Sequence, residues 1–139
     1  MTVLRQKYIS RTDCQTHRDR LYVFGDNMVR SGYGGQAGAM RGEPNSFGIP
    51  TKWFPSNQKS SFFYDEQFDE GSTVWLTLHG AFAHLTCVLD QGYDIVIPLD
   101  GLGTGLSRLP EYAPTIANYI EHQIQQLETQ FGRTIIDEN

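Results

Sequence analysis

The sequence lacks two kinds of segment. It has no stretch of about 18 consecutive apolar residues, which excludes a membrane-spanning helix, and no run of lysine or arginine, the usual footprint of tight binding to long nucleic acid. The formal net charge is -5. Residues 2–13, TVLRQKYISRTD, contain no apolar core of a signal peptide. We therefore expect a cytoplasmic protein with neither membrane association nor nonspecific nucleic-acid binding.

Cysteine is scarce, and metal-binding patterns are missing. Cys14 and Cys87 have no metal-ligand spacing, so free thiols are expected rather than a disulfide framework. His79 and His84 are five residues apart on a predicted helix and do not share a face, and no H-E-x-x-H occurs. We expect no metal site.

Three common catalytic motifs are absent as well. The first strand and its turn lack G-x-G-x-x-G, and neither G-x-x-x-x-G-K-[ST] nor G-x-S-x-G occurs in the chain. These absences argue against a Rossmann dehydrogenase, a P-loop NTPase and an α/β hydrolase. No cofactor is expected.

What remains is the composition of one ordinary globular domain. The 139 residues are 39% hydrophobic and 19% charged, enough for a single core, so residues 1–139 are expected to form one domain.

Hydrophobic periodicity predicts alternating strands and helices. Trp75, Leu78, Phe82, Leu85 and Leu89 recur at helical spacing, with Ser72 or Thr73 as N-cap and Gly92 just past the end. We expect further elements as follows: an edge strand over 3–9, a short helix in 10–20, a strand over 21–24 that Gly25 terminates, a short helix in GGQAGAM, an extended piece around 47–49, a loop over 53–72, a central strand over 95–97, a helix over about 110–131, and an edge strand in RTIID (133–137).

This order predicts the α/β class, with a mostly parallel or mixed sheet covered by helices. Such sheets bind ligands at the carboxyl ends of their strands. Two glycine-rich loops begin at such ends, and bare backbone there offers amides to an anion. Together they can hold a diphosphate, although each alone also suits an ordinary turn. The candidate residues are Gly34, Gly35, Gln36 and Ala37 in the first loop and Gly103, Thr104, Gly105, Leu106 and Ser107 in the second.

Several polar residues stand beside these loops. Gly25, Asp26 and Asn27 follow the strand where a ligand would lie, and an amide can bond a ribose hydroxyl, although either polar residue can instead close an Asx turn. Lys52 can meet a phosphate or act as an amine nucleophile if burial lowers its pKa; the alternative is a solvated surface charge. Asp100 can serve as a general base toward water.

The stretch LYVFGDN…GGQAGAM, followed by IVIPLDGLGTGLSRLPEYAPTIANYIEHQI, resembles the macro domain. Short phage and bacterial proteins with FGDN…GGQA…RGEPN…GIPTK look similar too. The resemblance implies a three-layer α/β/α fold that binds ADP-ribose, with its diphosphate between the two loops. Asn27 would then meet the distal ribose, and residues 34–37 and 103–107 the phosphates.

In one hydrolase branch of that family, a lysine in I-T-K and an aspartate in G-x-G-L-D do the chemistry. Lys52 matches the lysine, but Ser107 stands at the aspartate position, and the adenine partner is unassigned. From the two loops and the polar residues beside them, together with this resemblance, we expect hydrolysis of an ADP-ribosyl linkage at the distal ribose. Asn27 would orient the sugar, Lys52 would contact the reacting centre, and Asp100, which the resemblance does not supply, would position water. Two alternatives stay open: a non-catalytic ADP-ribose reader, and an interaction protein that uses aromatic residues of the 53–64 loop.

Overall fold

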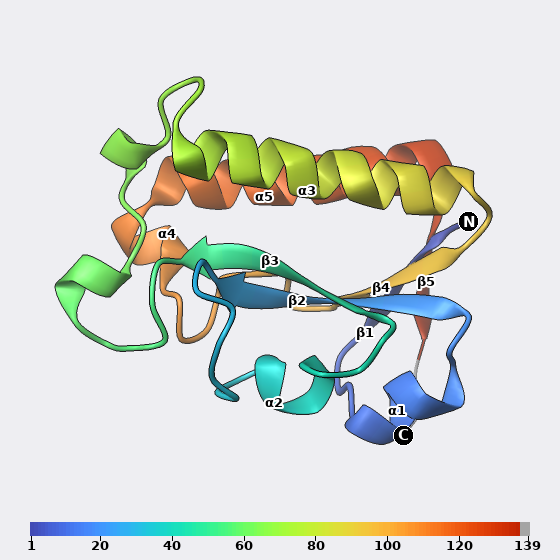
Figure 1. Ribbon diagram of the computed structural model, residues 1–139. Coiled ribbons are helices and arrows are strands. Elements are labelled where there is room, and N and C mark those ends of the chain that lie inside the picture. Colours follow the sequence, from blue (N-terminus) through green and yellow to red (C-terminus); the bar gives the residue numbers. More distant parts are fainter. Residues whose placement is uncertain (137–139) are drawn as a thin grey trace.

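The computed structural model describes residues 1–136, which form one parallel sheet between two layers of helices (Figure 1). All strand pairs are parallel, in the order β3-β2-β4-β1-β5. The strands are β1 (Val3–Gln6), β2 (Arg20–Asn27), β3 (Ser46–Lys52), β4 (Asp94–Pro98) and β5 (Arg133–Ile136). The predicted α/β class is confirmed, and β4 takes the central position. Asp137, the last residue of the predicted final strand, lies outside the described residues.

The helices divide unequally between the two faces. Figure 1 shows the long pair α3 and α5 along one face and the short α1 and α2 on the other. Their bounds are α1 (Arg11–Thr16), α2 (Ala37–Met40), α3 (Thr73–Asp90), α4 (Leu109–Tyr112) and α5 (Pro114–Phe131), with 3₁₀ turns η1 (Lys59–Ser61) and η2 (Asp65–Gln67). Within residues 1–136, no helix has the length and apolarity needed to cross a membrane.

Helix α3 follows the sequence closely. The hydroxyl of Ser72 accepts a hydrogen bond from the Trp75 amide at 3.2 Å, which caps the first turn. Its buried stripe, including Leu78, Leu85 and Leu89, packs in the larger core between the sheet and the long helices. A second, smaller core lies beneath the sheet, against α1 and α2. The sheet is therefore covered on both sides, which explains the apolar runs of its central strands.

The prediction of an edge position for the first strand is wrong. β1 lies inside the sheet, where Val3 pairs with Ile95 of β4 on one side and with Arg133 of β5 on the other. The polar residues of β1 disguised this position, because polar side chains are typical of edges. Arg5 is nevertheless buried, since its guanidinium donates to the carbonyls of Pro98 and Leu99 at 2.9 and 2.8 Å.

Gly25 does not end its strand. β2 continues through Gly25 to Asn27, paired with β3. A Cβ at Gly25 would lie 3.4 Å from Oγ1 of Thr51 and 3.5 Å from the amide nitrogen of Gly103. The second glycine-rich loop therefore lies within van der Waals reach of the strand at Gly25.

The helix predicted over 110–131 is two helices. Ala113 leaves the helical region, at φ -143° and ψ 67°, because the ring of Pro114 disfavours a helical conformation in the residue before it. The new N-terminus at α5 is capped from elsewhere. The carboxylate of Asp65, in η2, accepts hydrogen bonds from the amides of Thr115 and Ile116 at 3.0 and 3.2 Å. This contact ties the 53–72 segment to the long-helix layer.

The 53–72 segment is also more ordered than a loop. It contains both 3₁₀ turns, and Phe62 and Phe63 are fully buried. Phe62 forms an antiparallel bridge with Lys52, so the chain doubles back over the end of β3. Of the aromatic residues in the segment, Phe54 is the one with a largely exposed ring.

Gly48 provides a test of packing beneath the site. A Cβ at Gly48 would overlap the buried carboxylate of Asp26, so Gly48→Ala should destabilise the fold by about 2 kcal/mol. Gly80→Ala is the matched control, because nothing lies within 4 Å of its added Cβ on α3. It should leave stability unchanged or raise it by about 0.5–1 kcal/mol. Urea unfolding measures both; equal effects would contradict the packing described.

Candidate functional site

A pocket of about 290 Å³ opens at the carboxyl ends of β2 and β3. A smaller hollow of about 100 Å³ adjoins it, between the two glycine-rich loops. Of the predicted site residues, Gly25, Asp26, Asn27, Gly34, Ala37, Lys52, Leu106 and Ser107 line the pocket, and Gly35, Gln36, Gly103 and Gly105 line the hollow. The fold thus gathers residues that are up to 82 positions apart in the chain.

The two glycine-rich loops meet through Gln36. Its side-chain oxygen accepts from the amide of Gly25 at 2.8 Å, and its side-chain nitrogen donates to the carbonyl of Gly101 at 3.4 Å. Leu106 packs across this junction. Its Cδ1 lies so close to Gly34 that a Cβ added there would be only 3.1 Å away.

The loop amides beside this junction are candidates for anion binding. Within the part of the chain that the structure describes, the backbone amides of Gly34, Gly35, Gly105 and Leu106 donate no hydrogen bond. Exposed amides of this kind, in loops that follow parallel strands, form the concave anion sites typical of phosphate-binding proteins.

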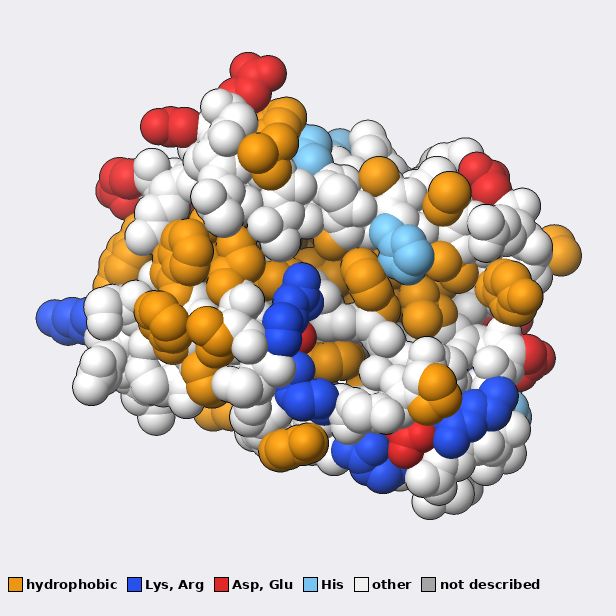
Figure 2. Space-filling model, viewed as in Figure 1, with side chains coloured by type: hydrophobic (Ala, Val, Ile, Leu, Met, Phe, Trp, Pro, Cys, Tyr) orange, Lys and Arg blue, Asp and Glu red, His pale blue; other side chains and the backbone are white. Residues whose placement is uncertain are grey.

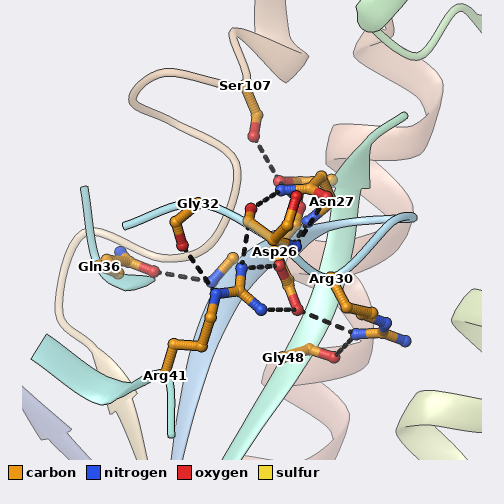
Figure 3. A network of polar contacts seen from close by, with 11 residues as sticks. Asp26, Asn27, Arg30, Gly32, Gln36, Arg41, Gly48 and Ser107 are labelled. Atoms are coloured by element: carbon orange, nitrogen blue, oxygen red, sulfur yellow. Dashed lines mark hydrogen bonds and ion pairs between the residues drawn. The ribbon is translucent and has the colours of Figure 1, made fainter. Parts of the chain in front are cut away.

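Asp26 is held within the protein (Figure 3). Its side chain is 3% exposed and forms ion pairs with Arg41 and Arg30. It also accepts from the amide of Asn27 at 2.8 Å. The carboxylate, predicted as a ligand contact, is therefore already satisfied by protein donors, and its contribution is to position Arg41.

Arg41 connects Asp26 to the first loop. Its Nε donates to the carbonyl of Gly32 at 2.7 Å and its Nη2 to the carbonyl of Ser31 at 3.3 Å (Figure 3). The sequence did not point to Arg41 or Arg30. A single arginine 15 residues beyond its partner carries no local signal of this role.

Asn27 closes the turn that follows β2. Its amide nitrogen donates to the carbonyl of Ser31 at 2.7 Å, and its oxygen accepts from the Ser31 amide at 3.4 Å. Arg30, inside this turn, has a positive φ of 57°. The bonded amide is four residues on rather than the two of an Asx turn. The side chain also lines the pocket with one amide hydrogen left over.

Lys52 is buried in the pocket wall and is not a solvated surface charge. Its Nζ donates to the carbonyl of Ser56 at 3.2 Å and lies 5.5 Å from the ring centre of Phe62. Across residues 1–136 it has no acidic partner, and burial lowers its pKa below the ordinary lysine value of 10.5. The 53–62 segment contributes to this burial, because its Ser56 carbonyl and Phe62 ring contact the amine.

Ser107 ties the second loop to β3. Its hydroxyl is hydrogen-bonded to that of Thr51, which in turn donates to the carbonyl of Asp26 at 3.2 Å. Asp100 and Thr104 lie apart from the pocket. Both line a hollow of about 560 Å³ near α5, and Asp100 also borders another of about 650 Å³ near α1. The structure therefore brings Asn27 and Lys52 into one pocket and leaves Asp100 outside it.

Neither cysteine is in a disulfide: Cys14 is buried and Cys87 exposed. Among the described residues, no group of three or more His, Cys, Asp or Glu side chains could hold a metal ion.

The fold and pocket define an α/β protein with a parallel five-stranded sheet and a basic cleft at the carboxyl edge of its strands. The chain belongs to the family of unknown function DUF7831, whose model matches residues 4–123. No curated protein and no solved structure matches it.

The pair of Asp26 and Arg41 should be energetically coupled. Arg41→Gln leaves a buried carboxylate with one arginine in place of two, so we expect a loss of about 2–3 kcal/mol in the free energy of unfolding. In a double-mutant cycle, Asp26→Asn with Arg41→Gln should cost at least about 1 kcal/mol less than the sum of the single changes. The control is Arg108→Gln, whose pair with Glu111 is half exposed and should contribute under about 1 kcal/mol. Additive losses would contradict the coupling.

Proposed function

We propose that this protein binds ADP-ribose in the pocket and the adjoining hollow, and hydrolyses an ADP-ribosyl linkage at the distal ribose. The observation that carries the proposal is the meeting of the two glycine-rich loops beside Asn27 and Lys52. The resemblance to the macro domain motivates the ligand, and the free loop amides supply donors of the kind that a diphosphate needs.

The charge of the pocket supports an anionic ligand. Asp26 is its one acidic lining residue, and that carboxylate is shared between two arginines. Arg41 and Lys52 supply positive charge on the same walls. The lining therefore carries one excess positive charge, which attracts an anionic diphosphate.

The adenine base is assigned in this proposal to the neighbouring hollow of about 650 Å³. It begins at Gly35 and Gln36, at the edge of the diphosphate hollow, and its other walls include Tyr8, Ile9 and Met40. Apolar and aromatic side chains of this kind pack against the faces of a base.

Lys52 is the residue proposed to act on the reacting centre. An amine whose pKa is lowered by burial is uncharged in a larger fraction of molecules, and an uncharged amine can attack the anomeric carbon of the distal ribose. As the bond from the lysine nitrogen to that carbon forms, the bond from the carbon to the leaving group breaks, and the leaving group takes the electron pair and the proton that the amine gives up. Water then attacks the same carbon, breaks its bond to the lysine nitrogen, and gives its proton to the released amine. Asp100 takes no part in this scheme, because it lies outside the pocket.

Binding is tested with free ADP-ribose by titration calorimetry. We expect a measurable Kd at or below about 1 mM, which corresponds to about 4 kcal/mol. Gly105→Val should weaken it at least about tenfold, because a side chain there would cover the loop amides, while open space around Gly105 spares the fold. Gly80→Ala, far from the pocket on α3, should bind normally. No heat at millimolar ADP-ribose would refute the ligand.

Catalysis is tested by following release of ADP-ribose from a modified peptide. Lys52→Ala should slow release by about a hundredfold or more, whereas Lys59→Ala, an exposed lysine seven positions later, should not. The wild-type rate should rise with pH as the amine loses its proton, and the midpoint should fall below 10.5 because burial lowers the pKa of Lys52. A Lys52→Ala rate equal to that of the wild type would remove the lysine from the mechanism.

A non-catalytic reader is the second candidate, and Ser107 is the observation that favours it. A hydroxyl bonded to Thr51 stands where the related hydrolases have an acid. Incubation with labelled ADP-ribosylated peptide distinguishes the two: a reader retains the peptide and leaves all of the label attached.

A further inference from the structure

Two parts of the chain carry opposite charge. Residues 1–52 hold eight of the 11 Lys and Arg residues but four of the 16 Asp and Glu residues, so the remaining 87 residues are strongly acidic. The basic part contains α1, α2, β2 and β3, and the acidic part contains α3 and α5. In Figure 2, several acidic side chains lie at the upper left and along the right, while most basic ones lie through the middle and at the lower right. The overall charge of -5 conceals this separation.

The basic face is built around two carboxylates, each held between two arginines. Glu43 is 8% exposed, and Arg11 and Arg18 bind its two oxygens at 3.1 and 2.7 Å. Asp26 is shared in the same way between Arg30 and Arg41. In each group, one negative charge faces two positive charges.

The two groups are continuous. Arg11 also donates to the carbonyl of Arg41 at 3.0 Å, which links the Glu43 group to the Asp26 group. We call the row formed by Arg11, Arg18, Arg30 and Arg41 the arginine band. Its side chains are 38%, 46%, 48% and 15% exposed, respectively. The band therefore offers guanidinium groups with two excess positive charges to solvent and ends at the pocket through Arg41.

We infer that the arginine band binds the phosphates of a single-stranded nucleic acid whose terminal group enters the pocket. The inference rests on the proposed function and extends it to the macromolecule that carries the ADP-ribose. Guanidinium groups pair with phosphate in a bidentate geometry. The exposed ring of Tyr33, 68% accessible on the pocket wall, gives a base a surface to stack on. An acidic peptide would use the charges but not the ring, which favours the nucleic acid.

The experiment measures binding by stopped-flow fluorescence anisotropy, before turnover. Free ADP-ribose is measured by displacement. The other three probes are a plain oligonucleotide of about five nucleotides, the same oligonucleotide with ADP-ribose on its terminal phosphate, and an ADP-ribosylated acidic peptide of equal charge. The variant is Arg18→Gln with Arg30→Gln, because both side chains are half exposed and their carboxylates keep another arginine. Lys59→Gln is the control outside the band.

We expect the wild type to bind the modified oligonucleotide at least about fivefold more tightly than free ADP-ribose at low salt, with a log–log salt slope near -1.4 for two neutralised phosphates. The double variant should lose that advantage while its affinity for free ADP-ribose stays the same, and Lys59→Gln should keep it. The inference is overturned if the double variant keeps the advantage, or if the acidic peptide gains as much as the oligonucleotide.

The plain oligonucleotide separates this inference from the proposed function. If free ADP-ribose does not bind, the proposed ligand is wrong. The band is still supported as a phosphate-docking surface if the plain oligonucleotide binds weakly, with a dependence on salt, and the double variant loses that binding. If free ADP-ribose binds and the plain oligonucleotide shows no salt-dependent binding, the pocket stands and the band is refuted.

Discussion

The pocket depends on one buried carboxylate. Asp26 lies over Gly48, where any side chain would collide with it, and it is satisfied by two arginines and a backbone amide. Burying a carboxylate is unfavourable unless it is paired and hydrogen-bonded, so these partners must be present whenever the strand ends are packed. Through Arg41, the same carboxylate fixes the backbone of Ser31 and Gly32. The shape of the first glycine-rich loop therefore follows from an interaction beneath it.

A second constraint holds the other wall. The 53–63 segment returns along the end of β3 and buries Phe62 and Phe63. It leaves the amine of Lys52 with a carbonyl and a ring as neighbours. The hydroxyl pair of Thr51 and Ser107 joins this wall to the second loop. The pocket is thus assembled from three separate stretches of chain, each anchored to the ends of β2 or β3.

Periodic and local features were predictable from the sequence. The stripe and cap of α3, the apolar centre of β4 and the α/β class follow from spacing and capping rules, and the structure confirms them. The glycine-rich loops were also found, because bare backbone after a strand is a local signal. Their convergence is in the structure as well, through Gly25 and Gln36.

Features set by distant contacts were not predictable. The interior position of β1 was missed, since the sequence does not reveal that Arg5 finds carbonyl partners 93 and 94 residues away. The burial of Lys52 depends on Phe62, and the capture of Asp26 depends on Arg41, and neither pair has a characteristic spacing. Asp100 was predicted beside the lysine because it lies in the same loop as Ser107, but the loop carries it to other hollows. Charge segregation was hidden for a related reason: the arginines meet from four separate positions.

The Asp65 cap on α5 has a consequence for the lysine. The segment that covers Lys52 is fixed at both ends. The bridge of Phe62 holds it to β3, and the hydrogen bonds from the amides of Thr115 and Ile116 to Asp65 hold it to α5. Loss of the Asp65 contact would let water reach the amine and raise the pKa of Lys52 toward that of a free lysine. The pKa of Lys52, at the end of β3, therefore depends on the contact between Asp65 and the first turn of α5.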